Sequence, residues 1–318
     1  MSSFAKLLAF APVLLALAVP ARAEFPDRNF KMIVPYGPGG GTDTMARTLV
    51  PDLEKALGKK VIIVNRSGAQ GQIGMAEVAS AKPDGYTLGL FSNTDLLLTA
   101  VLVKDAGFSM KSFDYLASFN ISANTLVVRK DAPFATYEQF IDYAKSNPGK
   151  ITLGVSGHTH VYEIIQQKVQ AGIDVNFMRF AGGGNSQTAL LGGHVDGLMI
   201  DKRFVSSLAD SGIKALAVAS PDRFKGLPDL PTFREKGVNL VNASRRVLVL
   251  PLGVPADRAE TIAKAVDSFA GGADFGAKLA KIDEDQDYMS GEAVRDSLAE
   301  QLESIQKVVD SNRADFTN

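Results

Sequence analysis

Apolar positions along this chain follow two patterns: short continuous runs, and longer stretches in which apolar residues recur every three or four positions. The short runs predict strands at Met32–Val34, Val61–Val64, Tyr86–Phe91, Thr125–Val128, Ile151–Val155, Val175–Phe180, Gly197–Ile200, Ala215–Ala219 and Val247–Leu250. The periodic stretches predict helices over Thr42–Leu57, Tyr137–Lys145, Val161–Gln170, Asp257–Phe269 and Glu292–Val309. Strands that are apolar on both faces are typical of parallel sheets covered by helices, so the alternation predicts an α/β fold with mainly parallel sheets.

Two segments have the character of connections between separate lobes. One is the strand Thr125–Arg129, and the other is Asn239–Leu250, in which a polar stretch precedes an apolar run. If both cross between lobes, the chain divides into a first lobe of residues 24–124 plus 245–318 and a second lobe of residues 125–244. Ligands of open α/β sheets bind at the carboxyl ends of the strands, so we expect a ligand cleft between the lobes.

The first 23 residues have the pattern of a secretory signal peptide. Lys6 precedes the apolar run Leu7–Val19, which is too short to span a bilayer comfortably, and Ala21-Arg22-Ala23 is a small-residue cleavage pattern. We expect cleavage after Ala23, with a membrane anchor as the less favoured alternative. An exported chain without any cysteine, and so without disulfides, is typical of the bacterial periplasm.

Composition and charge narrow the classes of function. The absence of cysteine excludes thiol chemistry, cysteine-zinc sites and iron–sulfur clusters. Without the two basic residues of the leader, 32 Lys and Arg stand against 35 Asp and Glu, a net charge of about −3. This balance gives no reason to expect nucleic acid or an acidic membrane surface as a partner.

The segment between the first predicted strand and the first predicted helix has the strongest binding character. Glycines let a backbone approach a ligand closely, and a helix N-terminus offers unpaired N–H groups with a partial positive charge. This combination predicts a seat for a carboxylate or a phosphate. The candidate residues of this loop are Tyr36, Pro38, Gly39, Gly40, Gly41, Thr42 and Asp43.

Three further loops follow predicted strands with small or hydroxyl residues. One such loop is weak evidence, because ordinary helix caps have the same composition. Several strand–loop–helix junctions of this kind together indicate a shared ligand site. The candidate residues of these loops are Ser92, Asn93, Ser156, Gly157, His158, Thr159, Gly182 and Gly183.

Charged side chains add candidates for contact with a second ligand group. Arg245 and Arg246 are either a solvated basic pair or the source of a guanidinium that forks onto a second carboxylate of the ligand. Asp201, with Lys202 and Arg203 beside it, raises the same question more weakly. We include Asp201 and both arginines among the predicted ligand-binding residues.

Signatures of catalysis are incomplete in this sequence. Ser156 is near a nucleophile elbow, but His158 stands where that motif requires its last glycine, and Thr42 replaces the final glycine of a dinucleotide fingerprint. His158 and His160 are two positions apart, and with His194 they leave a zinc site without identifiable carboxylates. Structural roles are favoured for the histidines, with hydrogen bonding of ligand by His158 or His160 as the alternative. We predict no catalytic residue, no metal and no cofactor.

Motifs that span nearly the whole mature chain carry a family resemblance. They are Phe25–Arg28, Ile33–Tyr36, Pro38–Asp43, Val64–Ala69, Gly71–Gly74, Ala81–Leu88, Gly182–Gly184, Leu190–Asp196, Lys214–Val218, Leu227–Thr232 and Pro251–Pro255. With these motifs the chain resembles the substrate-binding proteins of tripartite tricarboxylate transporters, the Bug-type periplasmic receptors. The resemblance implies a two-lobed periplasmic binding protein fold (type II-like) whose opening loop and second-lobe Ser-Gly loop grip one carboxylate, here at Gly39 to Asp43 and Ser156 to Thr159.

The resemblance also implies a non-catalytic receptor that delivers a small organic acid to membrane transporter subunits, as a monomer by default. Mono-, di- and tricarboxylates, aromatic acids and amino acids all remain open as ligands. Ala181 and the pair Arg245 and Arg246 depart from the family pattern, so we expect a ligand with a second acidic or strongly polar group. A receptor for a signalling partner is an alternative. A secreted α/β hydrolase is less favoured, because the elbow at Ser156 is incomplete.

Overall fold

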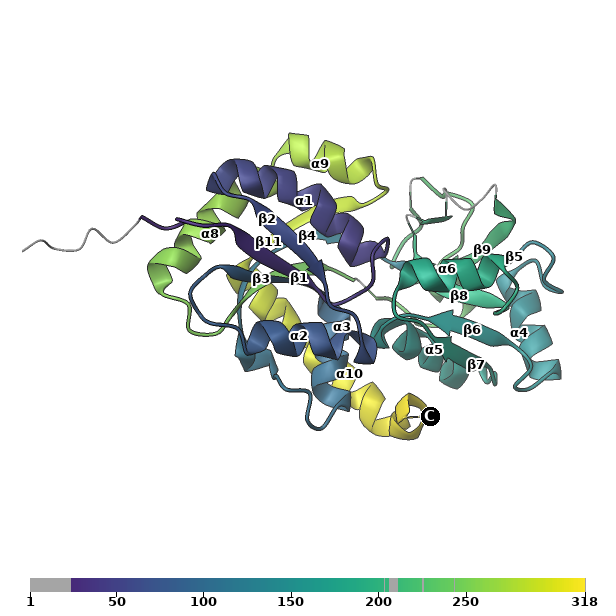
Figure 1. Cartoon of the computed structure of the whole chain (residues 1–318). Coiled ribbons are helices and arrows are strands. Elements are labelled where there is room, and N and C mark those ends of the chain that lie inside the picture. Colours follow the sequence, from purple (N-terminus) through teal and green to yellow (C-terminus); the bar gives the residue numbers. More distant parts are fainter. Residues whose placement is uncertain (1–23, 203, 206–210, 225, 243, 318) are drawn as a thin grey trace, which may run out of the picture.

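The computed structural model describes residues 24–317 apart from 203, 206–210, 225 and 243. These residues form two lobes, each built around one β-sheet (Figure 1). The predicted signal peptide, residues 1–23, and Arg203 lie outside the described residues. Within the described part of the chain, none of the helices is both long enough and apolar enough to cross a bilayer.

The first lobe holds a six-stranded sheet in the order β11-β4-β10-β3-β1-β2. Its strands are β1 (Phe30–Val34), β2 (Val61–Asn65), β3 (Thr87–Ser92), β4 (Phe113–Ile121), β10 (Arg246–Pro251) and β11 (Asp285–Ser290). One face is covered by α1 (Gly41–Leu57), α8 (Ala256–Ala270) and α9 (Ala273–Ala280), and the other by α2 (Gln72–Ala79), α3 (Asn93–Leu102) and α10 (Gly291–Thr317) (Figure 1). Alternate residues of a strand serve the two faces, since Met32 packs in the cluster of Leu49 while Ile33 packs in the cluster of Val294.

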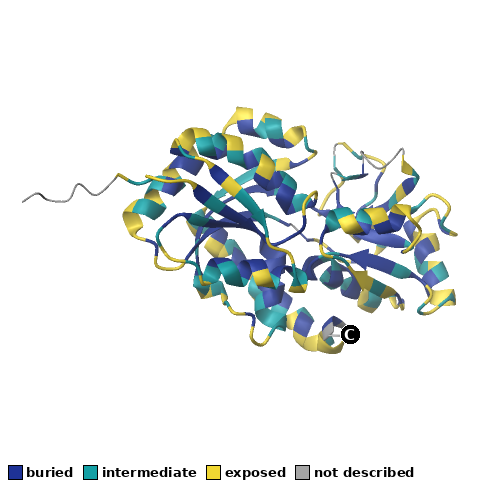
Figure 2. Ribbon diagram, viewed as in Figure 1, coloured by how far each residue is buried: buried dark blue, intermediate teal, exposed yellow. Residues whose placement is uncertain are grey.

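The second lobe holds a five-stranded sheet in the order β7-β6-β8-β5-β9. Its elements are β5 (Asn124–Arg129), α4 (Tyr137–Ser146), β6 (Thr152–Val155), α5 (His158–Ala171), β7 (Asn176–Arg179), α6 (Gly183–Leu191), β8 (Gly197–Asp201) and β9 (Ile213–Val218). There are also short 3₁₀ turns: η1 (Ala69–Gly71) and η2 (Met110–Ser112) in the first lobe, and η4 (Arg234–Lys236) in the second. The inner strands of both sheets are buried between their helices, as the dark blue strands of Figure 2 show, whereas the edge strands β7 and β11 are partly exposed.

Strand pairing is mixed in both sheets, which differs from the mainly parallel pairing predicted from the sequence. β1 is parallel to β2 and β3, and β6 is parallel to β7 and β8. β10 is antiparallel to β3 and β4, and β5 is antiparallel to β8 and β9. β5 and β10 follow segments that cross between the sheets, so they enter without the helical crossover that parallel neighbours require.

The two crossing segments lie side by side between the sheets. The chain leaves the first sheet after β4 and returns to it at β10. An isolated antiparallel bridge joins Ser122 to Ser244, in which the N–H of Ser122 donates to the carbonyl of Ser244 at 2.8 Å and the reverse bond measures 2.9 Å. These two short segments therefore link the lobes covalently and are hydrogen-bonded to each other.

Candidate functional site

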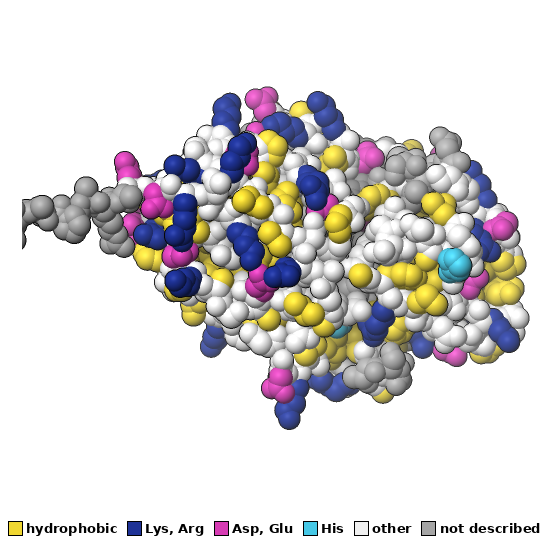
Figure 3. Space-filling model, in the orientation of Figure 1, with side chains coloured by type: hydrophobic (Ala, Val, Ile, Leu, Met, Phe, Trp, Pro, Cys, Tyr) yellow, Lys and Arg dark blue, Asp and Glu magenta, His cyan; other side chains and the backbone are white. Residues whose placement is uncertain are grey.

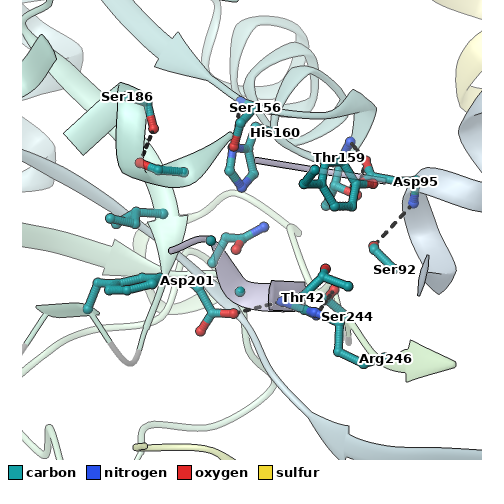
Figure 4. A pocket seen from close by; sticks show the side chains of 17 residues that line it. Thr42, Ser92, Asp95, Ser156, Thr159, His160, Ser186, Asp201, Ser244 and Arg246 are labelled. Carbon is teal, nitrogen blue, oxygen red and sulfur yellow. Dashed lines mark hydrogen bonds and ion pairs between the residues drawn. The ribbon is translucent and has the colours of Figure 1, made fainter. Parts of the chain in front are cut away.

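A cavity of about 570 Å³ opens between the two sheets, and both lobes contribute to its lining. β1, β3, β6 and β8 all end at this cavity, where they present Tyr36, Ser92, Ser156 and Asp201 (Figure 4). The cavity thus lies at the carboxyl ends of strands from both sheets. This is the place where open α/β sheets bind their ligands.

The loop before α1 and the loop before α6 meet backbone to backbone across this cavity. The N–H of Gly37 donates to the carbonyl of Ala181 over 3.4 Å. A Cβ on Gly182 would lie 3.2 Å from the nitrogen of Gly37, and a Cβ on Gly40 would lie 3.5 Å from the nitrogen of Gly183. The contact at Gly182 would be tighter than an ordinary one, so the close approach explains glycine at this position, whereas a Cβ on Gly40 would make an ordinary van der Waals contact.

The N-termini of α1 and α6 carry no side-chain cap. Gly40 precedes α1 and Gly182 precedes α6, and neither offers a side chain to accept an N–H. The opening N–H groups of a helix have no acceptor within the helix and concentrate a partial positive charge. Gly41, Thr42 and Gly183 line the cavity, so both helix ends reach it. This arrangement suits a carboxylate bound between the lobes.

The N-terminus of α5, in contrast, is occupied by groups of the chain itself. One carboxylate oxygen of Asp95, which lies on α3 in the first lobe, accepts from the Thr159 N–H at 2.6 Å and from the Thr159 hydroxyl at 2.7 Å. The N–H of Gly157 donates to the side-chain oxygen of Gln70 at 2.8 Å. Part of the loop that the sequence assigned to a ligand carboxylate is therefore engaged across the cleft.

Asp95 is held in place from its own lobe as well. The Tyr36 hydroxyl donates to the second carboxylate oxygen of Asp95 at 2.5 Å. The N–H of Asp95 donates to the Ser92 hydroxyl, which caps α3. Burial, together with the Asp95 charge, raises the pKa of Tyr36 well above its usual value, so this phenol remains a hydrogen-bond donor. The carboxylate of Asp95 thus joins α3, β1 and α5.

Arg246 on β10 forms a buried ion pair with Asp201 at the end of β8. The guanidinium Nη2 lies 2.9 Å from the Asp201 Oδ2, and each side chain is only 7% exposed. Nη1 donates to the Ser244 hydroxyl at 2.9 Å, and the Ser122 hydroxyl donates to the Asp201 Oδ1 at 2.8 Å. These four side chains join the lobes where the chain crosses between them, and Asp201, Ser244 and Arg246 line the cavity.

Two histidines lie near the α5 terminus. His160 lines the cavity, and its Nδ1 accepts from the Ser156 N–H at 3.1 Å. The Nδ1 of buried His158 lies 2.9 Å from the Thr99 hydroxyl of α3, outside the cavity lining. Burial lowers the pKa of both to about 4, although the Asp95 charge opposes the shift. At neutral pH His160 is therefore uncharged, with its proton on Nε2.

Ser156 and His160 do not form an activated nucleophile and base. The Ser156 hydroxyl lies 3.5 Å from the His160 Nδ1, but that nitrogen already accepts a backbone N–H. A pKa of about 4 also makes this imidazole a weak base near neutral pH. The geometry offers little support for the hydrolase alternative.

The cavity brings together part of the predicted ligand-binding set, drawn from all four loops and from the charged candidates. These residues are Tyr36, Gly40, Gly41, Thr42, Ser92, Ser156, Thr159, Gly183, Asp201 and Arg246.

The other predicted residues do not line the cavity, and several support the loops that do. They are Pro38, Gly39, Asp43, Asn93, Gly157, His158, Gly182 and Arg245. The Asp43 carboxylate accepts from the Gly39 N–H at 2.9 Å and pairs with Arg47 at 2.9 Å, so it fixes the turn before α1.

Arg245 and Asn93 make their side-chain contacts within the first lobe. The Arg245 guanidinium pairs with Asp287 of β11 at 2.5 Å, and the Asn93 amide donates to Gln301 of α10 at 2.8 Å. Neighbouring residues of a strand project to opposite faces, so of the two adjacent arginines only Arg246 reaches the cavity.

Several lining residues were not among those predicted from the sequence. They are Asp95, Asn124, Ser186, Ile200, Phe204 and Ser244; His160, which the sequence left open as a hydrogen-bond donor to the ligand, also lines the cavity. Asp95 had a local signal, because an acidic residue three positions after Ser92 is typical of the first turn of a capped helix. Asn124 begins β5 and Ser244 precedes β10, at the two points where the chain passes between the sheets. Only the fold brings these two residues together.

The outer surface offers no competing charged site on the face drawn. In Figure 3, Lys and Arg side chains are interspersed with acidic and neutral ones and form no continuous basic patch. Among the described residues, no group of three or more His, Asp or Glu side chains is placed to hold a metal ion.

Comparisons with known proteins agree with one another. Residues 45–313 match a family described as the Tripartite tricarboxylate transporter family receptor. Protein BugT of Bordetella pertussis (strain Tohama I) is 32% identical over 245 residues, which are 73% of this chain and 74% of BugT. Two solved structures each cover 90% of this chain and 98% of their own. The periplasmic binding protein BugD is 26% identical with a TM-score of 0.83, and an R. palustris protein with adipate is 25% identical with a TM-score of 0.85.

Proposed function

The chain belongs to the family of tripartite tricarboxylate transporter receptors, and on that basis we propose that it captures a small organic carboxylate between its lobes and presents it to the membrane subunits of a transporter. The family resemblance read from the motifs and the two-lobed α/β fold are confirmed. Members of this family are periplasmic solute-binding receptors and not enzymes. The relative with adipate supports a carboxylate as the ligand.

One observation carries the proposal: α1 and α6 direct uncapped N-termini into the same cavity from opposite lobes. A carboxylate between Thr42 and Gly183 would accept N–H bonds from both helices and would be stabilised by both helix dipoles. The bonds to the two helices form together only when the lobes are closed. Binding would therefore favour the closed arrangement over an open one, and the closed shape is what a membrane partner could recognise.

We assign the lobes to residues 24–124 plus 245–318 and to residues 125–244. The bridge between Ser122 and Ser244 supports this assignment, because it lies where the chain passes between the two sheets. A cleft that closes on its ligand needs no second copy, so we propose a monomer. We also propose that export to the periplasm follows cleavage after Ala23.

The experiment is calorimetric titration of the mature protein with a panel of organic acids, followed by a change at the α6 terminus. Gly183→Pro removes one N–H at the first position of the helix, where proline is tolerated, and Gly182 before it is already extended. A hydrogen bond to a charged group contributes roughly 1.5–3 kcal/mol, so the best acid should bind about 10- to 100-fold more weakly.

Gly183→Ala is the matched control. It retains the N–H, and its Cβ would lie 3.6 Å from the Gly40 Cα, an ordinary contact. We expect this variant to bind within a few-fold of the wild type. Failure of the wild type to bind any acid, or equal affinities for the proline and alanine variants, would contradict the proposed site.

A further inference from the structure

A carboxylate of the protein itself occupies one of the anion seats of the cavity. The side chain of Asp95 is buried, crosses from α3 to the N-terminus of α5, and accepts both the N–H and the hydroxyl of Thr159. The Tyr36 hydroxyl donates to its other oxygen. Donors arranged in this way, at a helix N-terminus, are those that a bound carboxylate would use.

The facing backbone is shaped to admit this carboxylate. Gly157 precedes α5 with a φ of +86°, and a Cβ on it would lie 2.7 Å and 2.8 Å from the two carboxylate oxygens of Asp95. Any other residue would meet both a steric clash and backbone strain at this position. The fit between the two lobes is therefore specific to glycine on one side and a short acid on the other.

Among the residues that the structure describes, the charges at the cavity favour one bound anion over two. Arg246 and Asp201 neutralise each other as a buried ion pair. Among the described residues, the Asp95 carboxylate accepts hydrogen bonds from three uncharged groups: a phenol, a backbone amide and a hydroxyl. The termini of α1 and α6 each supply about half a positive charge, which together balance roughly one carboxylate. A second ligand carboxylate that extended toward α5 would meet the negative charge of Asp95.

We infer that Asp95 acts as a built-in second carboxylate, so that this receptor selects acids with a single carboxylate and discriminates against dicarboxylates. The inference rests on the proposed function, because it specifies the ligand class of the same cavity. Asp95 is thus a specificity-determining residue. It narrows the expectation drawn from the sequence: the second group of the ligand is uncharged and polar, not acidic.

The test compares acids of equal chain length by calorimetry: butyrate with succinate, pentanoate with glutarate, and hexanoate with adipate. In each pair that shows binding, the wild type should prefer the monocarboxylate by at least tenfold. Asp95→Ala vacates the seat formed by Thr159 and Tyr36. This variant should therefore bind the dicarboxylate of a pair at least tenfold more tightly than the monocarboxylate. Formate added to this variant should fill the vacated seat, raise the melting temperature, and restore the preference for the monocarboxylate.

Two further variants separate charge from space. Asp95→Asn removes the charge but keeps an oxygen at the seat. The preference for the monocarboxylate over the dicarboxylate should therefore become smaller, and formate should change neither the melting temperature nor this preference. Asp142→Ala, an exposed change on α4, should leave the ranking of acids unchanged.

The outcomes distinguish this inference from the function on which it rests. A wild type that binds no carboxylate refutes the proposed function. A wild type that binds the dicarboxylate of a pair at least as tightly as the monocarboxylate refutes the role of Asp95 alone. An Asp95→Ala variant that keeps the wild-type ranking, or an Asp95→Asn variant with sharper discrimination, would refute it too.

Discussion

Glu163 on α5 links the second lobe to both crossing segments. The Asn124 amide donates to both of its carboxylate oxygens, at 3.0 and 2.9 Å, and the Asn242 amide donates to one of them at 2.7 Å. Burial raises the pKa of Glu163 to about 8, and it outweighs the amide hydrogen bonds, which lower that pKa. The charges of Asp95 and Asp201 add to the increase. The folded protein therefore holds a neutral Glu163 at pH 7.

This raised pKa makes stability depend on pH in a defined direction. In the unfolded chain Glu163 titrates near its ordinary value of 4.5, so between pH 4.5 and about 8 only the folded state keeps the proton. The contribution of Glu163 is complete below pH 4.5 and is lost as the pH rises through 8. Each pH unit between the two pKa values corresponds to about 1.4 kcal/mol, so the loss between pH 5 and pH 9 is about 4 kcal/mol.

The perturbation is Glu163→Gln, and the assay is urea denaturation from pH 5 to pH 9. The free energy of unfolding of the wild type, minus that of the variant, should fall by about 4 kcal/mol between pH 5 and pH 9, and the fall should flatten as the pH passes 8. A constant cost arises where the new amide faces the amide of Asn124, but this cost does not change with pH. His158 and His160 titrate in both proteins, so their effects cancel in the difference. A difference that stays constant across the range would refute this reasoning.

Other predictions concern the ion pair, a histidine and a glycine. Arg246→Met leaves Asp201 without its guanidinium and should lower the free energy of unfolding by roughly 3–5 kcal/mol in urea; adding Asp201→Asn should recover part of this loss, and strictly additive losses would argue against the pairing. His160 has a folded pKa of about 4 against 6.5, so it costs stability as the pH falls from 6.5 to 4. His160→Gln should therefore unfold at lower pH, by circular dichroism, whereas identical acid transitions would contradict the shift. Gly74→Ala places a Cβ 2.8 Å from backbone atoms of Pro35 and Arg66, so it should lower the free energy of unfolding by roughly 1–3 kcal/mol in a thermal melt. An unchanged melting temperature would show that the backbone moves aside to accept the Cβ.

The apolar pattern predicts most of the fold because most strands are buried on both faces. Every predicted strand and every predicted helix is present, with ends shifted by at most a few residues except in α10, which continues eight residues beyond the predicted end at Val309. Two strands escape the pattern. β4 carries Ser118 and Asn120, which are buried polar residues inside the sheet, and β11 is a polar edge strand. α2 and α9 are only eight residues long, too short for a clear helical period.

The site is predictable where it depends on local chemistry and not where it depends on the packing of the lobes. The roles of Gly40, Gly41 and Gly183 can be predicted from the local sequence. Glycines at the start of a helix let a ligand approach the backbone closely and leave the first N–H groups without a side-chain acceptor. The contact between Asp95 and Thr159 joins residues 64 positions apart on opposite lobes, so no local pattern contains it. The different directions of Arg245 and Arg246 likewise follow from the strand register and not from their identity.

The structure of the mature protein with its tightest-binding acid would show directly where the ligand carboxylate is held. We expect one carboxylate between the N-termini of α1 and α6, within hydrogen-bond distance of N–H groups near Thr42 and Gly183, with Asp95 still bound to Thr159. A carboxylate found outside the interlobe cavity, or one held without any N–H of either helix, would contradict it.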